Sequence, residues 1–204
     1  MAHGLLLAAG AGTRMGMPKA LVRDDAGRPW LTRAVAVLLD GGCPQVTVVL
    51  GAAADEAQQL LARSEPGDEL VDARVHVVRS RAWQSGMGAS LRTGLRSLAD
   101  AGTTTTAALV HLVDLPDVTA EVVARVLEHN TGDPAALARA SYLGRPGHPV
   151  LIGRDHWAGV SDSAAGDRGA RRYLSVRDPW LVECGDLASG RDVDEPTSDQ
   201  RPAQ

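Results

Sequence analysis

The residues best suited to chemistry lie near the start of the chain, between Gly10 and Lys19. Glycines at positions 10, 12 and 16 let the main chain adopt positive φ and approach a ligand closely, so several backbone N–H groups can point at one anion. Arg14 and Lys19 add two positive charges to this stretch, one as a planar fork and the other as a mobile point charge. The combination predicts a binding site for a polyphosphate.

Two common phosphate-binding loops do not fit this stretch. The dinucleotide fingerprint requires a third glycine where this chain has Met15, and the Walker loop requires glycine immediately before the lysine, where Pro18 stands. A Gly-rich turn with a purely structural role would explain the glycines. It would not explain why Arg14 and Lys19 accompany them.

A second candidate group follows the most convincing buried strand, which we expect over residues 107–113. Asp114 lies at the carboxyl end of this strand, the end at which ligands bind in open α/β sheets. Pro116 disfavours helical geometry at the residue before it, and Thr119 is a better N-cap for the helix that follows. We therefore expect Asp114 to be free to bind a metal ion.

The elements that must position these groups alternate between strand and helix, which is typical of βαβ units and a parallel sheet. We predict a single three-layer α/β/α domain with a mostly parallel, Rossmann-like sheet over residues 1–196, followed by a polar tail over residues 197–204. A polar surface connection is expected over residues 64–69. Strands are expected at residues 5–8, 45–50, 75–78, 107–113, 135–142 and 180–184, and helices at 31–39, 53–62, 89–99, 119–127 and 166–174. Around His148 we expect an ordered non-helical loop that leads into another strand.

The composition narrows the class of protein. The 204 residues suffice for one well-filled domain, and with 3% aromatic residues and no Phe the core must consist of Ala, Val and Leu. A net charge of −4 gives no reason to expect a nucleic acid or an anionic membrane as partner. Cys43 and Cys184 suit neither a disulfide framework nor a zinc site. No signal peptide or spanning segment is apparent, so we expect a cytoplasmic protein.

The stretch Leu5-Leu6-Leu7-Ala8-Ala9-Gly10-Ala11-Gly12-Thr13-Arg14-Met15-Gly16-Met17-Pro18-Lys19 resembles the nucleotidyltransferases whose first strand runs into L-A-A-G-x-G-x-R-M-G-x-x-K, most closely the molybdenum cofactor cytidylyltransferases. The resemblance extends from Leu5 to Pro196 and implies the nucleotide-diphospho-sugar transferase type of fold. It implies that the loop holds a nucleoside triphosphate and that Arg14 and Lys19 stabilise charge as pyrophosphate leaves. It also implies a nucleotide site formed by Leu7, Ala8, Ala9, Gly10, Gly12, Thr13, Gln84, Ser85, Gly86 and Ser90.

The later motifs are less specific. The resemblance implies Mg²⁺ bound by Asp114 together with Asp192 or Asp194, although a solvated acidic turn would look similar. Alternation along an extended segment would turn Asp192 and Asp194 to the same side. The resemblance also implies acceptor contacts from Arg145, His148, Asp167 and Arg171. A structural histidine and a solvated basic helix start are the ordinary alternatives. The family usually continues P-E-D-L, whereas this chain has Pro196-Thr197.

The implied reaction is Mg²⁺-dependent transfer of CMP from CTP to a phosphorylated acceptor of the molybdopterin type, with delivery of the product to a molybdoenzyme or its chaperone. Guanylyltransferase relatives typically read L-A-G-G, so Ala9 favours cytidine. A guanylyltransferase acting on the same or a small phosphorylated acceptor stays open, as does a non-catalytic nucleotide-binding regulator. A reductase with NAD(P)H or flavin is disfavoured by Met15 and by Leu50-Gly51, where the dinucleotide fold places an acidic residue.

Overall fold

A computed structural model describes residues 1–62, 73–101 and 104–194. In these residues seven strands form one sheet in the order β3-β2-β1-β4-β6-β5-β7. Strand β6 runs antiparallel to β4 and β5, and the other described pairings are parallel, which confirms the mostly parallel sheet. The strands are β1 (Ala2–Ala8), β2 (Val46–Leu50), β3 (Val75–Arg79), β4 (Ala107–Leu112), β5 (Leu137–Tyr142), β6 (Arg145–Gly153) and β7 (Trp180–Glu183).

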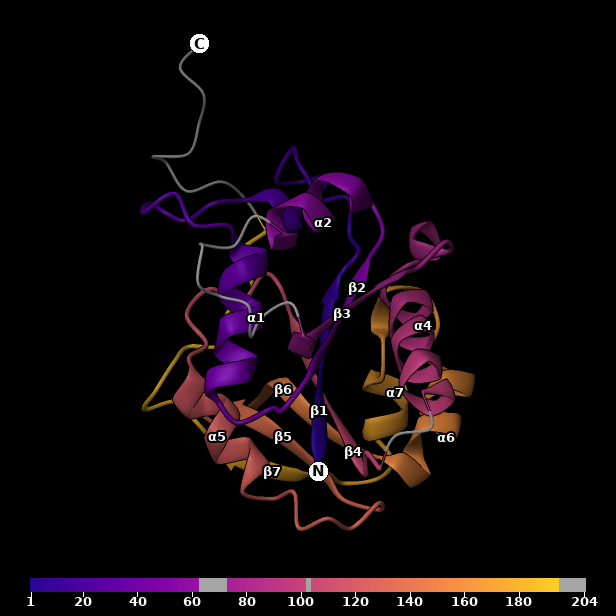
Figure 1. The fold of residues 1–204 in the computed structure, drawn as a ribbon. Coiled ribbons are helices and arrows are strands. Elements are labelled where there is room, and N and C mark those ends of the chain that lie inside the picture. Colours follow the sequence, from indigo (N-terminus) through magenta and orange to yellow (C-terminus); the bar gives the residue numbers. More distant parts are fainter. Residues whose placement is uncertain (63–72, 102–103, 195–204) are drawn as a thin grey trace.

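Helices cover both faces of the sheet, so the expected three layers are present (Figure 1). Successive side chains of a strand point to opposite faces, and β1 shows this directly. Leu6 packs with α1 and α5, whereas Leu5 packs with α4, α6 and α7. The helices are α1 (Trp30–Asp40), α2 (Ala54–Ala62), α4 (Met87–Asp100), α5 (Ala120–Leu127), α6 (Trp157–Ser163) and α7 (Arg171–Leu174), with short 3-10 helices η1 (Lys19–Leu21), η2 (Trp83–Ser85), η3 (Arg154–His156) and η4 (Gly166–Arg168).

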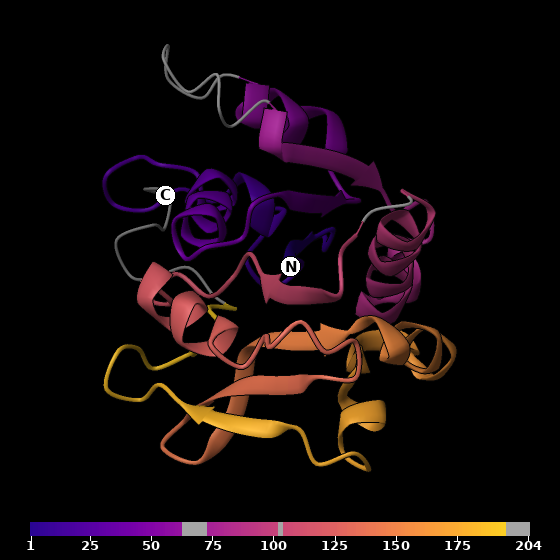
Figure 2. The same cartoon turned by 60° about the horizontal axis from the view of Figure 1, so that its bottom comes forward.

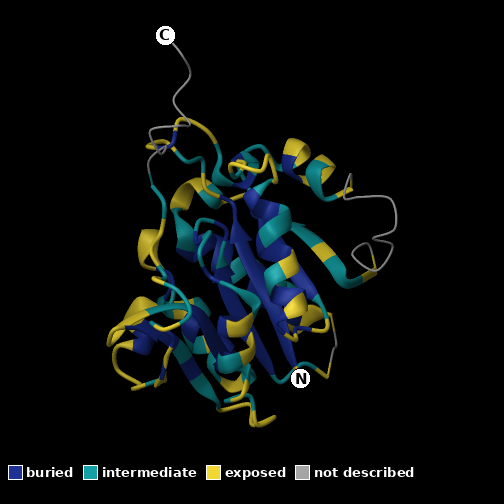
Figure 3. Ribbon diagram, turned by 90° about the vertical axis from the view of Figure 1, so that its left-hand side faces the viewer, coloured by how far each residue is buried: buried dark blue, intermediate teal, exposed yellow. Residues whose placement is uncertain are grey.

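The central strands are buried on both faces, which explains why they read as continuous apolar runs (Figure 3). Strand β7 forms an outer edge of the sheet, seen in yellow at the bottom of Figure 2. Cys43 and Cys184 are buried free thiols. Within the described ranges, no helix has both the length and the apolar character needed to cross a bilayer. The connection predicted over residues 64–69 and the polar tail predicted over residues 197–204 lie outside the described residues.

Two local predictions were wrong. The segment around His148 is not a loop, because β6 begins at Arg145 and forms a hairpin with β5 through the turn Leu143-Gly144. Both turn residues have positive φ, 53° and 75°, as a tight two-residue hairpin turn requires, and the irregular register between the strands accommodates the prolines. The helix expected over residues 166–174 is divided by Gly169, whose φ of 49° ends η4 before α7 begins.

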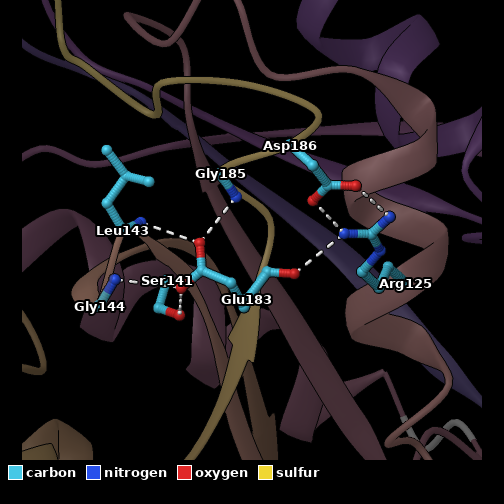
Figure 4. Close-up of polar contacts among 7 residues, drawn as sticks. All are labelled: Arg125, Ser141, Leu143, Gly144, Glu183, Gly185 and Asp186. Carbon is cyan, nitrogen blue, oxygen red and sulfur yellow. Dashed lines mark hydrogen bonds and ion pairs between the residues drawn. The ribbon is translucent and has the colours of Figure 1, made fainter.

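The hairpin is fixed at its turn by Glu183, at the end of β7 (Figure 4). Its carboxylate accepts hydrogen bonds from the backbone of Leu143 (2.8 Å), Gly144 (3.1 Å) and Gly185 (2.8 Å), and from Ser141 Oγ (2.9 Å). These donors, the backbone N–H groups first, lower the pKa of Glu183 to about 2. The charged carboxylate therefore joins β5, β6 and β7 at one point.

Burial lowers the pKa of several histidines of the sheet, and His111 is one of them. His111 in β4 is 1% exposed, and its Nδ1 atom has no partner among the described residues. Burial, followed by the charge of Arg33, lowers the pKa of His111 to about 4 from 6.5. Between these two values the unfolded chain binds more protons than the folded chain, so stability must rise with pH.

We expect wild-type protein to lose stability as the pH falls from about 6.5 to 4, with His111 contributing up to about 3 kcal/mol of the change. His111→Leu should flatten this part of the curve, because it removes the group that takes up a proton on unfolding. Urea unfolding at several pH values measures the effect, with His129→Leu near the surface as control. An unchanged slope in His111→Leu would contradict the assignment.

Candidate functional site

The fold brings the two candidate groups to one edge of the sheet. Strands β1 and β4 are neighbours and parallel, with Leu7 opposite Leu112, so the chain leaves both at the same edge. The helix after β1 covers one face, and α4, which precedes β4, covers the other (Figure 1). The resulting crevice is the place where open α/β sheets bind ligands. The Gly-rich loop and Asp114 both lie there.

The loop after β1 is folded back tightly on itself. Gly12 has a φ of +60°, and a Cβ atom there would lie 2.0 Å from the carbonyl oxygen of Met17, so this position requires glycine. Met15 is 7% exposed and packs into the core beneath the loop. The residue that breaks the dinucleotide fingerprint therefore anchors the loop, and Lys19 follows in η1.

Lys19 bridges two carboxylates that are far apart in the sequence. Its Nζ atom lies 2.7 Å from Asp114 Oδ2 and 2.6 Å from Asp194 Oδ1. The Lys19 side chain is 15% exposed, and the desolvation works against its charge. The hydrogen bonds and charges of Asp114 and Asp194 outweigh this effect and raise the pKa of Lys19. The ammonium group thus stays charged at neutral pH.

Arg14 completes a cluster of two cations and two carboxylates. Its guanidinium lies 2.7 Å from Asp194 Oδ2 and is 70% exposed, so it is free to turn toward a ligand. The pKa of Asp194 is lowered, first by the hydrogen bond from Lys19 and then by the charges of Lys19 and Arg14. The cluster is nearly neutral overall. Binding of a polyphosphate would replace the carboxylates as partners of the cations.

The two carboxylates suit a magnesium ion that also binds substrate. The sequence predicted that Asp114 would be free. In the structure one of its oxygens contacts Lys19. Its other oxygen, Oδ1, is buried and has no partner in the described chain. Mg²⁺ usually takes one or two protein carboxylates and completes its shell with water and phosphate oxygens. Among residues 1–62, 73–101 and 104–194, no group of three or more ligating side chains is arranged around a metal position.

The carboxyl-terminal segment reaches this cluster because two anchors hold it. The backbone N–H of Val193 donates to the carbonyl of Asp114 at 3.0 Å. Further back, Asp117 Oδ2 accepts hydrogen bonds from Ser189 N (2.6 Å), Ser189 Oγ (2.5 Å) and Gly190 N (3.2 Å). Nothing in the sequence pattern connects position 117 with position 189, so this anchor was not predicted.

Loss of the Asp117 anchor should impair the site without unfolding the protein. We expect Asp117→Ala to lower kcat by about tenfold to a hundredfold, because the segment that carries Asp194 is no longer held in place. Ser189→Ala, which removes one of the hydrogen bonds, should have a smaller effect. Steady-state kinetics together with a melting curve measure this. A wild-type kcat in Asp117→Ala would show that the anchor has no role in catalysis.

An open cleft of about 600 Å³ extends from this cluster across the loop. Gln84, Gly86 and Ser90 line its far side, from η2 and the start of α4. Ser85 is exposed and does not line this cleft. Trp83 lines the cleft, although it was not predicted from the sequence. The other predicted residues along the cleft are Leu7, Ala8, Ala9, Gly10, Gly12, Thr13, Arg14, Lys19, Asp114, Asp167, Asp192 and Asp194.

A second cleft of about 350 Å³ adjoins the first. Leu7, Met87, Leu112, Asp167 and Asp192 line both, so a molecule in the second cleft can reach one in the first. The second cleft contains three of the predicted acceptor residues: His148, Asp167 and Arg171. The structure does not bring Arg145 to either cleft, because it lies exposed beside the hairpin turn.

His148 lines the second cleft as a neutral group. Burial first, then the charges of His111, Arg139 and Arg171, lower the pKa of His148 to about 3. At neutral pH the imidazole therefore carries no charge. It can donate or accept one hydrogen bond toward a ligand, but it cannot act as an acid by releasing an imidazolium proton near pH 7.

Comparisons with known proteins agree with this geometry. A curated relative, nicotine blue oxidoreductase of Paenarthrobacter nicotinovorans, is 38% identical over 203 residues, covering 94% of this chain and 91% of that protein. The crystal structure of the Rv0371c homologue of Mycobacterium sp. strain JC1 has a TM-score of 0.75 at 26% identity, covering 95% of this chain and 90% of that one. Rv0371c of Mycobacterium tuberculosis H37Rv, solved in complex with manganese, has a TM-score of 0.64 at 23% identity, covering 90% and 86%.

The family model described as the MobA-like NTP transferase domain matches residues 4–181. This range includes the Gly-rich loop, Asp114 and most of both clefts. The chain belongs to the MobA-like NTP transferase family, and its domain is that of a nucleotidyltransferase.

Proposed function

We propose that the protein transfers CMP from CTP to a phosphorylated small-molecule acceptor, with a divalent metal ion and release of pyrophosphate. The observation that carries the proposal is the position of Lys19 between Asp114 and Asp194, beside the Gly-rich loop. Such a site offers positive charge to a triphosphate and oxygen ligands to a metal ion. The molybdopterin type of acceptor and delivery to a molybdoenzyme rest on the sequence resemblance.

The proposed chemistry is one displacement at phosphorus. A phosphate oxygen of the acceptor forms a bond to the α-phosphorus of CTP, and the bond from that phosphorus to the β-phosphate oxygen breaks, so pyrophosphate leaves with the electron pair. The loop N–H groups and Arg14 hold the leaving phosphates, while Lys19 neutralises charge on them as it develops. A phosphate nucleophile is already ionised at neutral pH, so the contribution of the protein is orientation and charge stabilisation.

A metal ion would supply further positive charge against the phosphate oxygens. Asp114 and Asp194 would hold it, with Asp114 Oδ1 as the atom that has no other described partner. The manganese in the Mycobacterium tuberculosis neighbour supports a divalent ion in this fold. Asp192 lies where both clefts meet and does not contact Lys19, so we assign the second metal position to Asp194. Magnesium is our proposal for the resident ion.

Base choice is proposed to depend on Ala9, which lines the first cleft. Calorimetric titration with CTP, GTP, ATP and UTP in the presence of Mg²⁺ tests this, and we expect CTP to bind about tenfold tighter than the others. Ala9→Gly should reduce the preference, since it recreates the loop of the guanylyltransferase relatives. Tightest binding of GTP by the wild-type protein would favour the guanylyltransferase alternative instead.

The name of the Paenarthrobacter nicotinovorans relative favours a second candidate, an oxidoreductase that binds NAD(P)H or flavin in the first cleft. The local structure argues against a dinucleotide. Strand β2 ends at Leu50 and is followed by Gly51 instead of an acidic residue, and a Cβ atom at Gly51 would lie 2.6 Å from Trp83 Cβ. Trp83 therefore fills the space next to the end of β2. Oxidation of NADH or NADPH in the presence of flavin is the assay for this candidate.

A further inference from the structure

The second cleft has a charge pattern that the proposed displacement at phosphorus does not by itself explain. Part of its walls is apolar, formed by residues such as Leu91, Val110 and Ile152. Acidic side chains lie where it meets the first cleft, at Asp167 and Asp192. The other charged and titratable groups that line it are Arg139, Arg168, Arg171 and His148.

Two of these arginines lie away from the nucleotide. Arg139 and Arg171 line the second cleft, and they also line a groove of about 590 Å³ on its outer side, which includes Asp178. Neither arginine lines the first cleft. They therefore mark the end of the second cleft opposite the junction with the triphosphate site.

Arg139 is held in an unfavourable place for a cation. It lies half-buried on β5, and its Nε and Nη2 atoms donate to the carbonyl of Gly147 at 3.3 and 3.1 Å. Burial and the positive charge of Arg171 both lower its pKa. In the described chain, no carboxylate forms an ion pair with Arg139 or Arg171. The fixed orientation and the lack of a counter-charge are typical of a site that receives an anion.

We propose that Arg139 and Arg171 form an anion-binding subsite at the outer end of the second cleft, so that the acceptor carries a second anionic group, a carboxylate or an acidic hydroxyl, on an apolar body. The neutral His148 lies along the same cleft and adds a polar contact without adding charge. This inference rests on the proposed function, because it describes the acceptor of that reaction. It divides the acceptor into a reacting phosphate near Asp192, an apolar middle and a distal anion.

Binding of two probes that share an uncharged ring system and differ in one charged group tests the subsite directly. Naphthoate and naphthamide have the same apolar ring system and differ in charge, and either is small enough for the second cleft. In calorimetric titrations at low salt without nucleotide, we expect naphthoate to bind about tenfold tighter than naphthamide, because a charged hydrogen-bonding pair is stronger than a neutral one. Arg139→Gln and Arg171→Gln should each remove most of this preference and leave naphthamide binding unchanged.

Three further variants make the outcome decisive. Arg172→Gln is the matched control, since Arg172 is exposed beside Arg171 and lines none of the three cavities. Arg171→Lys keeps the charge but loses the fork, and should recover part of the preference. Lys19→Met should keep the preference in full. Equal binding of both probes by wild-type protein, or loss of the preference in Lys19→Met instead of in the Arg171 variant, overturns the proposal. Because no turnover is measured, this result is separate from the test of CMP transfer.

Discussion

Lys19→Met is expected to lower the rate of pyrophosphate release by about a hundredfold to a thousandfold, with a melting temperature close to that of the wild type. Lys19 contacts both carboxylates of the cluster and lines the nucleotide cleft, so its charge is available to the leaving phosphates. The Lys19 side chain is 15% exposed and lines the cleft, and methionine can replace its apolar stem. The measurement is kcat with the preferred triphosphate, at saturating metal.

The matched control is Arg28→Met, which removes an exposed cation that pairs with Asp24 outside both clefts. This variant should keep wild-type kcat. If Lys19→Met turned over as fast as Arg28→Met, Lys19 would have no part in the reaction. A large fall in the melting temperature of Lys19→Met would instead show that the lysine mainly holds Asp114 and Asp194 together.

Asp114→Asn is expected to lower turnover by a similar factor, about a hundredfold to a thousandfold, and part of the loss should be recovered at high Mg²⁺. The substitution removes the charge of the carboxylate whose Oδ1 atom has no partner among the described residues. The amide oxygen can still bind Mg²⁺, but with lower affinity. Turnover measured over a range of Mg²⁺ concentrations should show a raised half-saturation value.

Two other carboxylates make this result specific. Asp194→Asn should raise the metal requirement in the same way, while Asp192→Asn should leave it near the wild-type value, because Asp192 does not contact Lys19. Asp133→Asn, in an exposed turn, controls for the loss of one negative charge. If Asp114→Asn and wild-type protein needed the same Mg²⁺ concentration, Asp114 would not be a metal ligand.

The sheet and its helices could be predicted because each depends on local patterns. Leu5 and Leu6 alternate between the two faces of β1, and the apolar run of β4 ends at the edge where Asp114 emerges. The hairpin around His148 was missed because prolines and glycines usually interrupt strands. Here Leu143-Gly144 supply the tight turn, and Glu183 holds it from β7.

The missing parts of the site depend on contacts between distant residues. The link from Asp117 to Ser189 and the approach of Arg139 to Arg171 each join segments that no short motif connects. Trp83 follows the same rule, since only the packing of β2 against η2 brings it to the cleft beside Gly51. The motif around Lys19 identified the first cleft because its residues are neighbours in the sequence. The second cleft is lined by residues of β1, α4, β4, β5 and β6 and of the segments 167–174 and 190–192, so its full set of residues needed the structure.

Pyrophosphate release distinguishes nucleotidyl transfer from the oxidoreductase alternative. CTP, GTP, ATP and UTP should be incubated in parallel with the protein, Mg²⁺ and phosphorylated acceptors that include the molybdopterin form of the cofactor, and oxidation of NADH and NADPH with flavin should be followed in separate samples. We predict pyrophosphate release that is fastest with CTP, requires the acceptor and falls about a hundredfold to a thousandfold in Lys19→Met. Oxidation of NADH or NADPH, without pyrophosphate release from any triphosphate, would contradict the account.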